Sequence, residues 1–151
     1  MGIRVDGLDT LTQPIPAGAL GATNGKIAFY YTPRHSSGDY EKFGHNNPRM
    51  FTVKGTSNYI DVYFNTNFNA TLRTFIGAEN TNDSQAVALT AGTKHLIEIE
   101  YNATQCILYV DGVVKITITP ASGINFGADI PSTFYGGSDF SGTTQGDAIF
   151  S

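Results

Sequence analysis

Two carboxylates on alternate residues, Glu98 and Glu100, are the first candidates for chemistry in this sequence. Alternation along a β-strand puts both side chains on one face, and a retaining glycoside hydrolase needs two carboxyl groups about 5–5.5 Å apart. No third carboxylate follows at 102 or 103, and the chain has no Trp that could line sugar subsites. We interpret the pair as the solvated face of an amphipathic strand. Glycoside hydrolysis is kept as a remote alternative, and the expectation is a protein that is not an enzyme.

Aromatic and amide side chains offer a second kind of chemistry, the recognition of sugars. Tyr59, Tyr63 and Asn65 alternate along one segment, and Arg34 and Tyr40 lie in a polar segment close by in the sequence. Outward tyrosines on a sheet form stacking surfaces, and an exposed aromatic patch often marks an interface. The alternative is that these tyrosines pack across strands or are buried by a neighbouring subunit. Both interpretations stay open at this point.

The residues that serve other reactions are sparse. The single cysteine, Cys106, rules out an intrachain disulfide and a cysteine-based zinc site. The three histidines are scattered without ligand spacing, and we expect His95 to cap the start of a strand. Neither a nucleophile motif of the Gly-x-Ser-x-Gly type nor a phosphate-binding loop occurs.

Charge and hydropathy restrict the partners. The net charge is −4 and no Lys/Arg cluster stands out, whereas a nucleic-acid binder needs a basic surface to neutralise phosphates. The first residues lack the basic-then-apolar layout of a signal peptide, and no apolar run approaches the ~20 residues that span a bilayer. We therefore expect neither nucleic-acid binding nor membrane insertion.

The elements that must position these residues are β-strands. Strand-like runs separated by turn residues recur along residues 1–151, which we interpret as a single domain. The segment 59–65 places Ile60, Val62 and Phe64 toward a core and leaves Asp61 outward with the two tyrosines. Asp111-Gly112, between two alternating segments, predicts a tight hairpin. The expected strands are 3–6, 26–32, 49–54, 59–65, 70–78, 86–89, 93–101, 105–110 and 113–119, with irregular connectors at 11–25 and from 120 onward.

Several segments together resemble the concanavalin A-like lectin/glucanase superfamily, with the laminin G-like, pentraxin-like branch as the nearest match. They are 25–33 (GKIAFYYTP), 89–101 (LTAGTKHLIEIEY), 107–113 (ILYVDGV), 134–138 (FYGGS) and 146–149 (GDAI). The resemblance implies an all-β, two-sheet antiparallel jelly-roll sandwich. It also implies that the segment after His95 has no catalytic role, although laminarinase-type hydrolases on this fold carry alternating carboxylates in an E-x-D-x-x-E pattern.

Two departures from the family bear on assembly. Many sugar-binding members stack sugars on Trp, which is absent here. The family's last strand usually continues beyond the position that corresponds to Ser151, and an incomplete edge strand invites association. We therefore expect a homo-oligomer or a module of a larger protein.

The resemblance also implies a candidate cation site. Asp147 stands where many laminin G-like domains keep an Asp that supports a structural calcium ion, and Asp6 can join it from the first strand. Oxygen ligands of this kind suit a hard cation. An ordinary turn role for Asp147 is the competing interpretation.

Two functions follow from these observations. The first is a non-catalytic, lectin-like module of a phage tail or bacterial surface protein that binds a glycan or cell-surface polysaccharide. The second is a structural virion protein, such as a head-decoration or tail component, that packs against other virion or surface-protein subunits. Either would act in a virion or at the extracellular surface of a cell.

Overall fold

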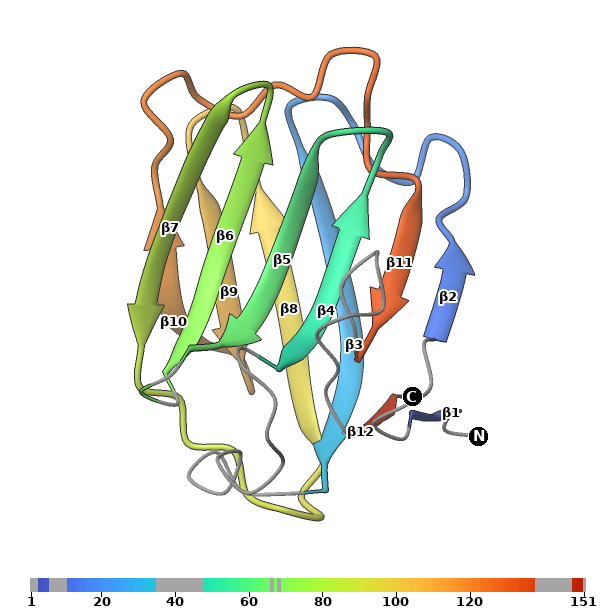
Figure 1. The fold of residues 1–151 in the computed structure, drawn as a ribbon, viewed down its shortest axis with the longest axis vertical. Coiled ribbons are helices and arrows are strands. Elements are labelled where there is room, and N and C mark those ends of the chain that lie inside the picture. The colour runs from blue at the N-terminus through green and yellow to red at the C-terminus, as the bar shows by residue number, and fades with distance from the viewer. Residues whose placement is uncertain are drawn as a thin grey trace.

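Alternating apolar residues produce a chain built from strands. The computed structural model describes residues 3–5, 11–34, 48–65, 67, 69–137 and 148–150, and within these ranges every regular element is a β-strand (Figure 1). No helix in this part of the chain is long and apolar enough to cross a membrane.

The strands form two antiparallel six-stranded sheets that face each other. In the view of Figure 1 one lies in front and the other behind, and we call them the front and back sheets. The front sheet contains, in spatial order, β2 (Leu11–Pro14), β11 (Thr133–Gly136), β4 (Arg49–Lys54), β5 (Tyr59–Phe64), β6 (Ala70–Ile76) and β7 (Glu79–Gln85). The back sheet contains β1 (Ile3–Val5), β12 (Ala148–Phe150), β3 (Gly25–Pro33), β8 (His95–Tyr101), β9 (Cys106–Val110) and β10 (Val113–Ile118).

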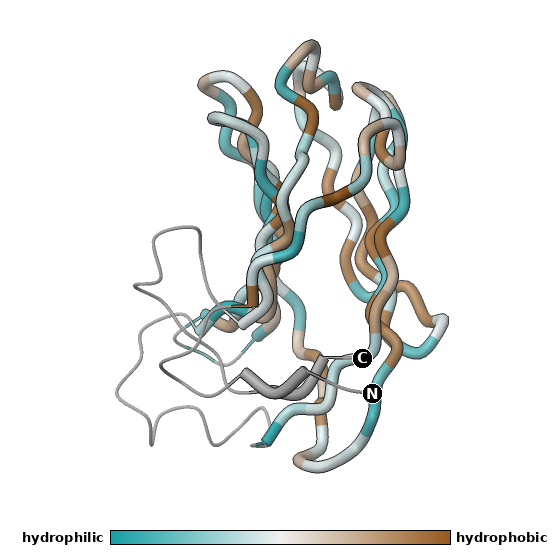
Figure 2. Tube along the Cα trace, turned by 90° about the vertical axis from the view of Figure 1, so that its right-hand side faces the viewer, coloured by the Kyte–Doolittle hydropathy of each residue, from teal (hydrophilic) through white to brown (hydrophobic). Residues whose placement is uncertain are grey.

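The core lies between the two sheets. Figure 2 views the layers from the edge, and hydrophobic residues recur along both. On β5 the side chains of Ile60, Val62 and Phe64 are buried, as the alternation predicts. Phe29 of the back sheet meets Phe51 of the front sheet edge-on, with ring centroids 5.1 Å apart. The expected two-sheet jelly-roll sandwich is therefore confirmed.

The strongest local signals in the sequence are confirmed as well. Asp111 and Gly112 adopt the left-handed region, with φ of 54° and 75°, and connect β9 to β10 as a two-residue turn. The conformation explains the Asp-Gly pair, because a type I′ turn needs positive φ at both positions. Strand β4 matches its expected limits, and β3, β5, β8, β9 and β10 match within two residues at each end.

Two expectations about strands were wrong. The segment expected at 86–89 is not a strand, and β7 precedes it at Glu79–Gln85. Its sequence, ENTNDSQ, carries no apolar alternation because it forms a polar edge strand paired on one side with β6. The connector expected at 11–25 also contains the short strand β2, which joins the opposite edge of the front sheet by pairing with β11, whereas β11 itself overlaps the segment 134–138 that resembles a strand of the family.

Three carboxylates fix loops by accepting backbone hydrogen bonds. Asp111 accepts from the Leu96 amide at 2.8 Å, and its second oxygen lies 2.7 Å from His95 Nδ1. Glu79 accepts from the Ala121 and Ser122 amides at 2.7 and 3.1 Å. Asp129 accepts from three successive amides in the β4–β5 turn, those of residues 56, 57 and 58. Buried His95 is thus paired at the start of its strand, in agreement with the capping role expected of it.

These contacts predict a loss of stability in acid. The hydrogen bond with His95 holds the pKa of Asp111 below its usual value, and hydrogen bonding from Ser122 does the same for the pKa of Glu79. A carboxylate whose pKa is lower in the folded state binds more protons when unfolded, so stability rises with pH in that window. The stabilisation should be complete above about pH 4.3 and should decline as the pH falls through the lower folded-state pKa values.

Urea unfolding between about pH 6 and pH 3 measures this dependence. The variants Glu79→Gln and Asp111→Asn should each flatten the pH profile, whereas Glu100→Gln, on the exposed side of β8, should leave its slope unchanged. An unchanged slope in both loop variants would contradict the prediction.

Candidate functional site

The outer face of the front sheet, the one turned away from the core, carries an unusual set of side chains on β4, β5 and β6. Strand pairing aligns Thr52, Asp61 and Arg73 in one row across the three strands. Tyr59 and Tyr63 lie two residues to either side of Asp61 on β5 and therefore share its face. We call the cluster formed by Arg49, Tyr59, Asp61, Tyr63 and Arg73 the Asp61 cluster.

Asp61 is the centre of this cluster and is 1% exposed, although strand alternation directs it away from the core. Arg73 binds it in a bidentate manner, with Nε 3.0 Å from Oδ1 and Nη2 2.5 Å from Oδ2. Arg49 Nη1 lies 3.2 Å from Oδ2. A buried charge needs such pairing because desolvation of an isolated ion is costly.

The two tyrosines flank this ion pair network. The Arg49 guanidinium lies 4.5 Å from the ring centroid of Tyr63, and Arg73 lies 5.0 Å from that of Tyr59 and 5.3 Å from that of Tyr63. Tyr59 also stacks on Phe75 of β6, with centroids 5.2 Å apart. Cation–π contacts of this kind hold guanidinium groups in defined orientations. Both tyrosines remain partly exposed.

Burial and charge perturb the ionisation of the cluster. Burial raises the pKa of Tyr59, so its hydroxyl stays protonated at neutral pH. Burial opposes the charged form of Arg73, but the hydrogen bond and the charge of Asp61 outweigh it and raise the pKa of Arg73. The cluster therefore presents fixed charges and hydroxyl groups, which can orient a polar ligand.

One arginine in the cluster is incompletely bonded. The Nε and Nη1 atoms of Arg49 are buried and have no hydrogen-bond partner among the described residues. Nη1 lies within ion-pair distance of Asp61, but outside hydrogen-bond geometry. Buried donors are nearly always satisfied in folded proteins, so an exception calls for an explanation.

The tyrosines of the sequence-based site are therefore neighbours in space, in contact with charged groups that the prediction did not include. Their stacking also agrees with the alternative that they pack across strands. Asn65 has a local role, because its Oδ1 accepts the amides of Asn67 and Asn69 at 2.9 and 3.2 Å in the β5–β6 connection. Arg34 follows β3, in the other sheet, and is exposed. Tyr40 lies outside the described residues.

Sequence reasoning missed three members of the cluster: Arg49, Asp61 and Arg73. A signal was present for Asp61, which alternation places between the two tyrosines. Arg73 becomes a partner only through the register of β5 and β6. The position of Arg49 depends on a β-bulge between Arg49 and Phe51, because uninterrupted alternation would turn it inward with Phe51 and Val53.

The calcium expectation concerns Asp6 and Asp147, which both lie outside the described residues. Within the described ranges no group of three or more His, Cys, Asp or Glu side chains could hold a metal ion. The calcium site stays a prediction that rests on family resemblance.

The other chemically distinctive residues are already engaged. Glu98 pairs with Lys26 at 2.8 Å on the outer face of the back sheet, remote in topology from β5. Cys106 is buried, and burial raises the pKa of its thiol to about 12, so it is protonated at neutral pH and a poor nucleophile.

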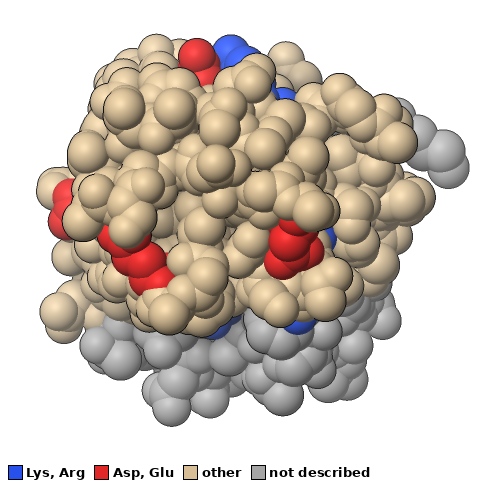
Figure 3. All heavy atoms as spheres, turned by 90° about the horizontal axis from the view of Figure 1, so that it is seen from above, with Lys and Arg blue, Asp and Glu red and all other residues tan. Residues whose placement is uncertain are grey.

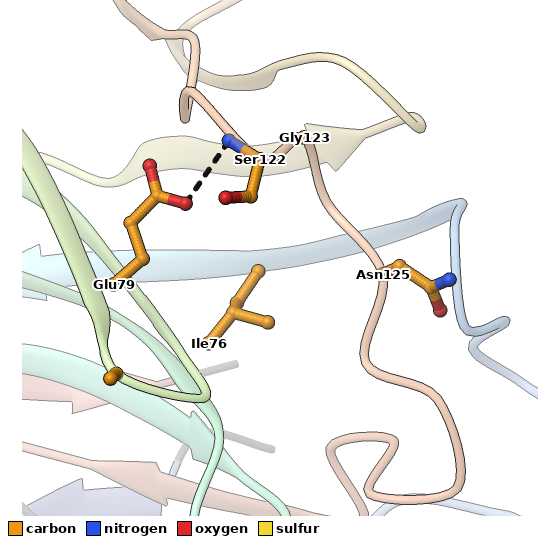
Figure 4. A pocket seen from close by; sticks show the side chains of 6 residues that line it. Ile76, Glu79, Ser122, Gly123 and Asn125 are labelled. Carbon is orange, nitrogen blue, oxygen red and sulfur yellow. Dashed lines mark hydrogen bonds between the residues drawn. The ribbon is translucent and has the colours of Figure 1, made fainter.

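A pocket of about 480 Å³ lies between the β6–β7 turn and the segment after β10. Its lining includes Ile76, Glu79, Ser122 and Asn125, and the Glu79 carboxylate points toward the Ser122 amide (Figure 4). The carboxylate is therefore occupied in holding the loop. Seen from above, the described surface is mostly uncharged, with separate acidic groups and a few basic ones (Figure 3).

Solved structures with the same architecture define the class of fold. The structure of domains LG4-5 of the mouse laminin α1 chain is 13% identical in sequence to this chain and superposes on it with a TM-score of 0.69. The match covers 96% of this chain and 38% of the laminin chain. The carbohydrate-binding module CBM40 of a Ruminococcus gnavus IT-sialidase, solved with α2,3-sialyllactose, is 11% identical with a TM-score of 0.66. The match covers 98% of this chain and 85% of the CBM40 chain. The Caenorhabditis elegans galectin LEC-6 shares 10% identity with a TM-score of 0.58, over 93% and 89% of the two chains.

These similarities confirm the expected fold. The chain shares its two-sheet sandwich with these proteins, which include a galectin and a carbohydrate-binding module. No protein-family model matches the sequence, and no curated protein sequence does.

Proposed function

We propose that this domain binds carbohydrate, without cleaving it, on the outer face of β4, β5 and β6. The observation that carries the proposal is the Asp61 cluster: a buried ion network, flanked by partly exposed tyrosines, on a face that strand alternation directs away from the core. A folded domain gains little from burying such a network when apolar residues would fill the same space, so binding is the better explanation.

The chemistry of the cluster suits sugars. Guanidinium and carboxylate groups hydrogen-bond to hydroxyl groups, and tyrosine rings pack against the apolar faces of sugar rings while their hydroxyls remain polar. The galectin LEC-6 and the sialidase module with this fold support the proposal. The pairing of Glu98 with Lys26 favours the non-catalytic interpretation.

A glycan array followed by titration of any bound glycan tests the proposal. We expect Tyr63→Ala to weaken binding by about tenfold or more, because it removes a stacking surface and the ring that supports both guanidinium groups. The matched control is Tyr30→Ala, which removes a 43% exposed tyrosine from the outer face of the back sheet. An equal loss in both variants, or a wild-type protein that binds no glycan, would overturn the proposal.

The wider setting of the protein stays a prediction. A phage tail, virion or bacterial surface location is an expectation from composition and resemblance, as are oligomers and partner subunits. The glycan proposal stands independently of them, because it depends only on the described residues of β4, β5 and β6.

A further inference from the structure

The charges of the Asp61 cluster do not balance. Arg73 occupies both oxygens of Asp61, whereas Arg49 approaches only Oδ2 and forms no hydrogen bond with it. Among the described residues, Asp61 is the one carboxylate within ion-pair distance of Arg49. One negative charge is therefore shared by two guanidinium groups.

The additional positive charge, that of Arg49, is largely shielded from solvent. The Arg49 side chain is 11% exposed, and its buried Nε and Nη1 atoms have no acceptor in the part of the chain that the structure describes. An arginine keeps its proton at any ordinary pH, so burial cannot neutralise it as it can a lysine. An anion of planar shape, above all a carboxylate, that reaches the exposed part of the Arg49 side chain offers the missing negative charge.

The surroundings of Arg49 indicate what carries this anion. The Tyr63 ring lies against the Arg49 guanidinium, and Tyr59 lies on the same face of β5. A ligand whose anionic group reaches Arg49 would therefore place its neighbouring atoms beside a tyrosine surface suited to a sugar ring. We infer that the ligand is an acidic sugar whose carboxylate pairs with Arg49, an inference that rests on the proposed function and specifies its ligand.

Matched polysaccharides test this inference. Polygalacturonate, hyaluronan and polysialic acid are immobilised, each beside a carboxyl-reduced form in which the carboxylate is converted to a hydroxymethyl group. We expect at least one acidic form to bind about tenfold or more tightly than its reduced form, with the preference weakening at high salt. Arg49→Gln should bring the two affinities of that pair within about twofold of each other.

Two further variants test whether the preference depends on the charge of Arg49, on the planar shape of its guanidinium group, or on its place in the front sheet. Arg49→Lys keeps the charge but loses the planar fork, so it should retain part of the preference. Lys26→Gln removes a cation from the outer face of the back sheet and should leave the preference intact. Thermal unfolding of each variant establishes that it is folded before binding is measured.

The outcomes separate this inference from the proposed function. Equal binding of acidic and reduced forms would overturn the acidic ligand and leave carbohydrate binding standing. Binding to none of the polysaccharides and to no array glycan would overturn both. Binding to dextran sulfate alone would overturn the carboxylate in favour of a sulfate ester. A preference that survives Arg49→Gln would remove Arg49 from the site.

Discussion

Replacing Asp61 by Asn is expected to lower the free energy of unfolding by about 3–5 kcal/mol, the usual cost of removing one partner from a buried ion network. Asn keeps the size of the side chain and one acceptor oxygen, but it removes the only negative charge between Arg49 and Arg73 among the described residues. The guanidinium groups of these two side chains, which are 11% and 18% exposed, would then repel each other without a counter-ion among the described residues. Urea unfolding of the two proteins at neutral pH measures the difference.

A matched control uses the ion pair of the back sheet. Glu98→Gln removes a carboxylate that pairs with Lys26, whose side chain is 54% exposed. Solvent-exposed pairs contribute little, so the expected loss is much smaller than that of Asp61→Asn. A loss of the same small size for Asp61→Asn would contradict the buried, charged state of the cluster. The same variant should also fail to bind the glycan.

The second large effect is a difference in stability loss between variants of the two arginines that contact Asp61. Arg73→Gln should cost about 2–4 kcal/mol, because it breaks a bidentate pair and leaves Asp61 with only the weaker contact to Arg49. Arg49→Gln should change stability by less than about 1 kcal/mol, because it removes a surplus buried charge together with a single ion-pair contact. Urea unfolding of both variants measures the asymmetry.

A double-mutant cycle strengthens this comparison. The coupling of Arg73 to Asp61 should exceed that of Arg49 to Asp61 by at least about 1 kcal/mol, since only Arg73 is hydrogen-bonded to the carboxylate. If Arg73→Gln and Arg49→Gln lowered the free energy of unfolding equally, Asp61 would interact with both arginines to the same extent. The argument for an acceptor-deficient Arg49 would then fail as well.

The sequence alone was sufficient for the features that depend on neighbouring residues. Alternation placed Ile60 and Val62 in the core and Tyr59, Asp61 and Tyr63 on the opposite face, because side chains of a strand point in alternate directions. The Asp-Gly turn was equally predictable, since only a few residue types tolerate positive φ. Segments scattered over 25–149 were enough to predict the sandwich.

Only the tertiary structure decided which side chains meet on that face. Arg73 reaches Asp61 through the register of β5 and β6, and Arg49 faces outward because a β-bulge interrupts the alternation of β4. Neither register nor bulge is encoded in a local apolar pattern, since both arise from the pairing of whole strands. The sequence therefore determined the two-sheet architecture and the tyrosine face of β5. The charged partners that turn this face into a candidate binding site depend on contacts between strands distant in sequence.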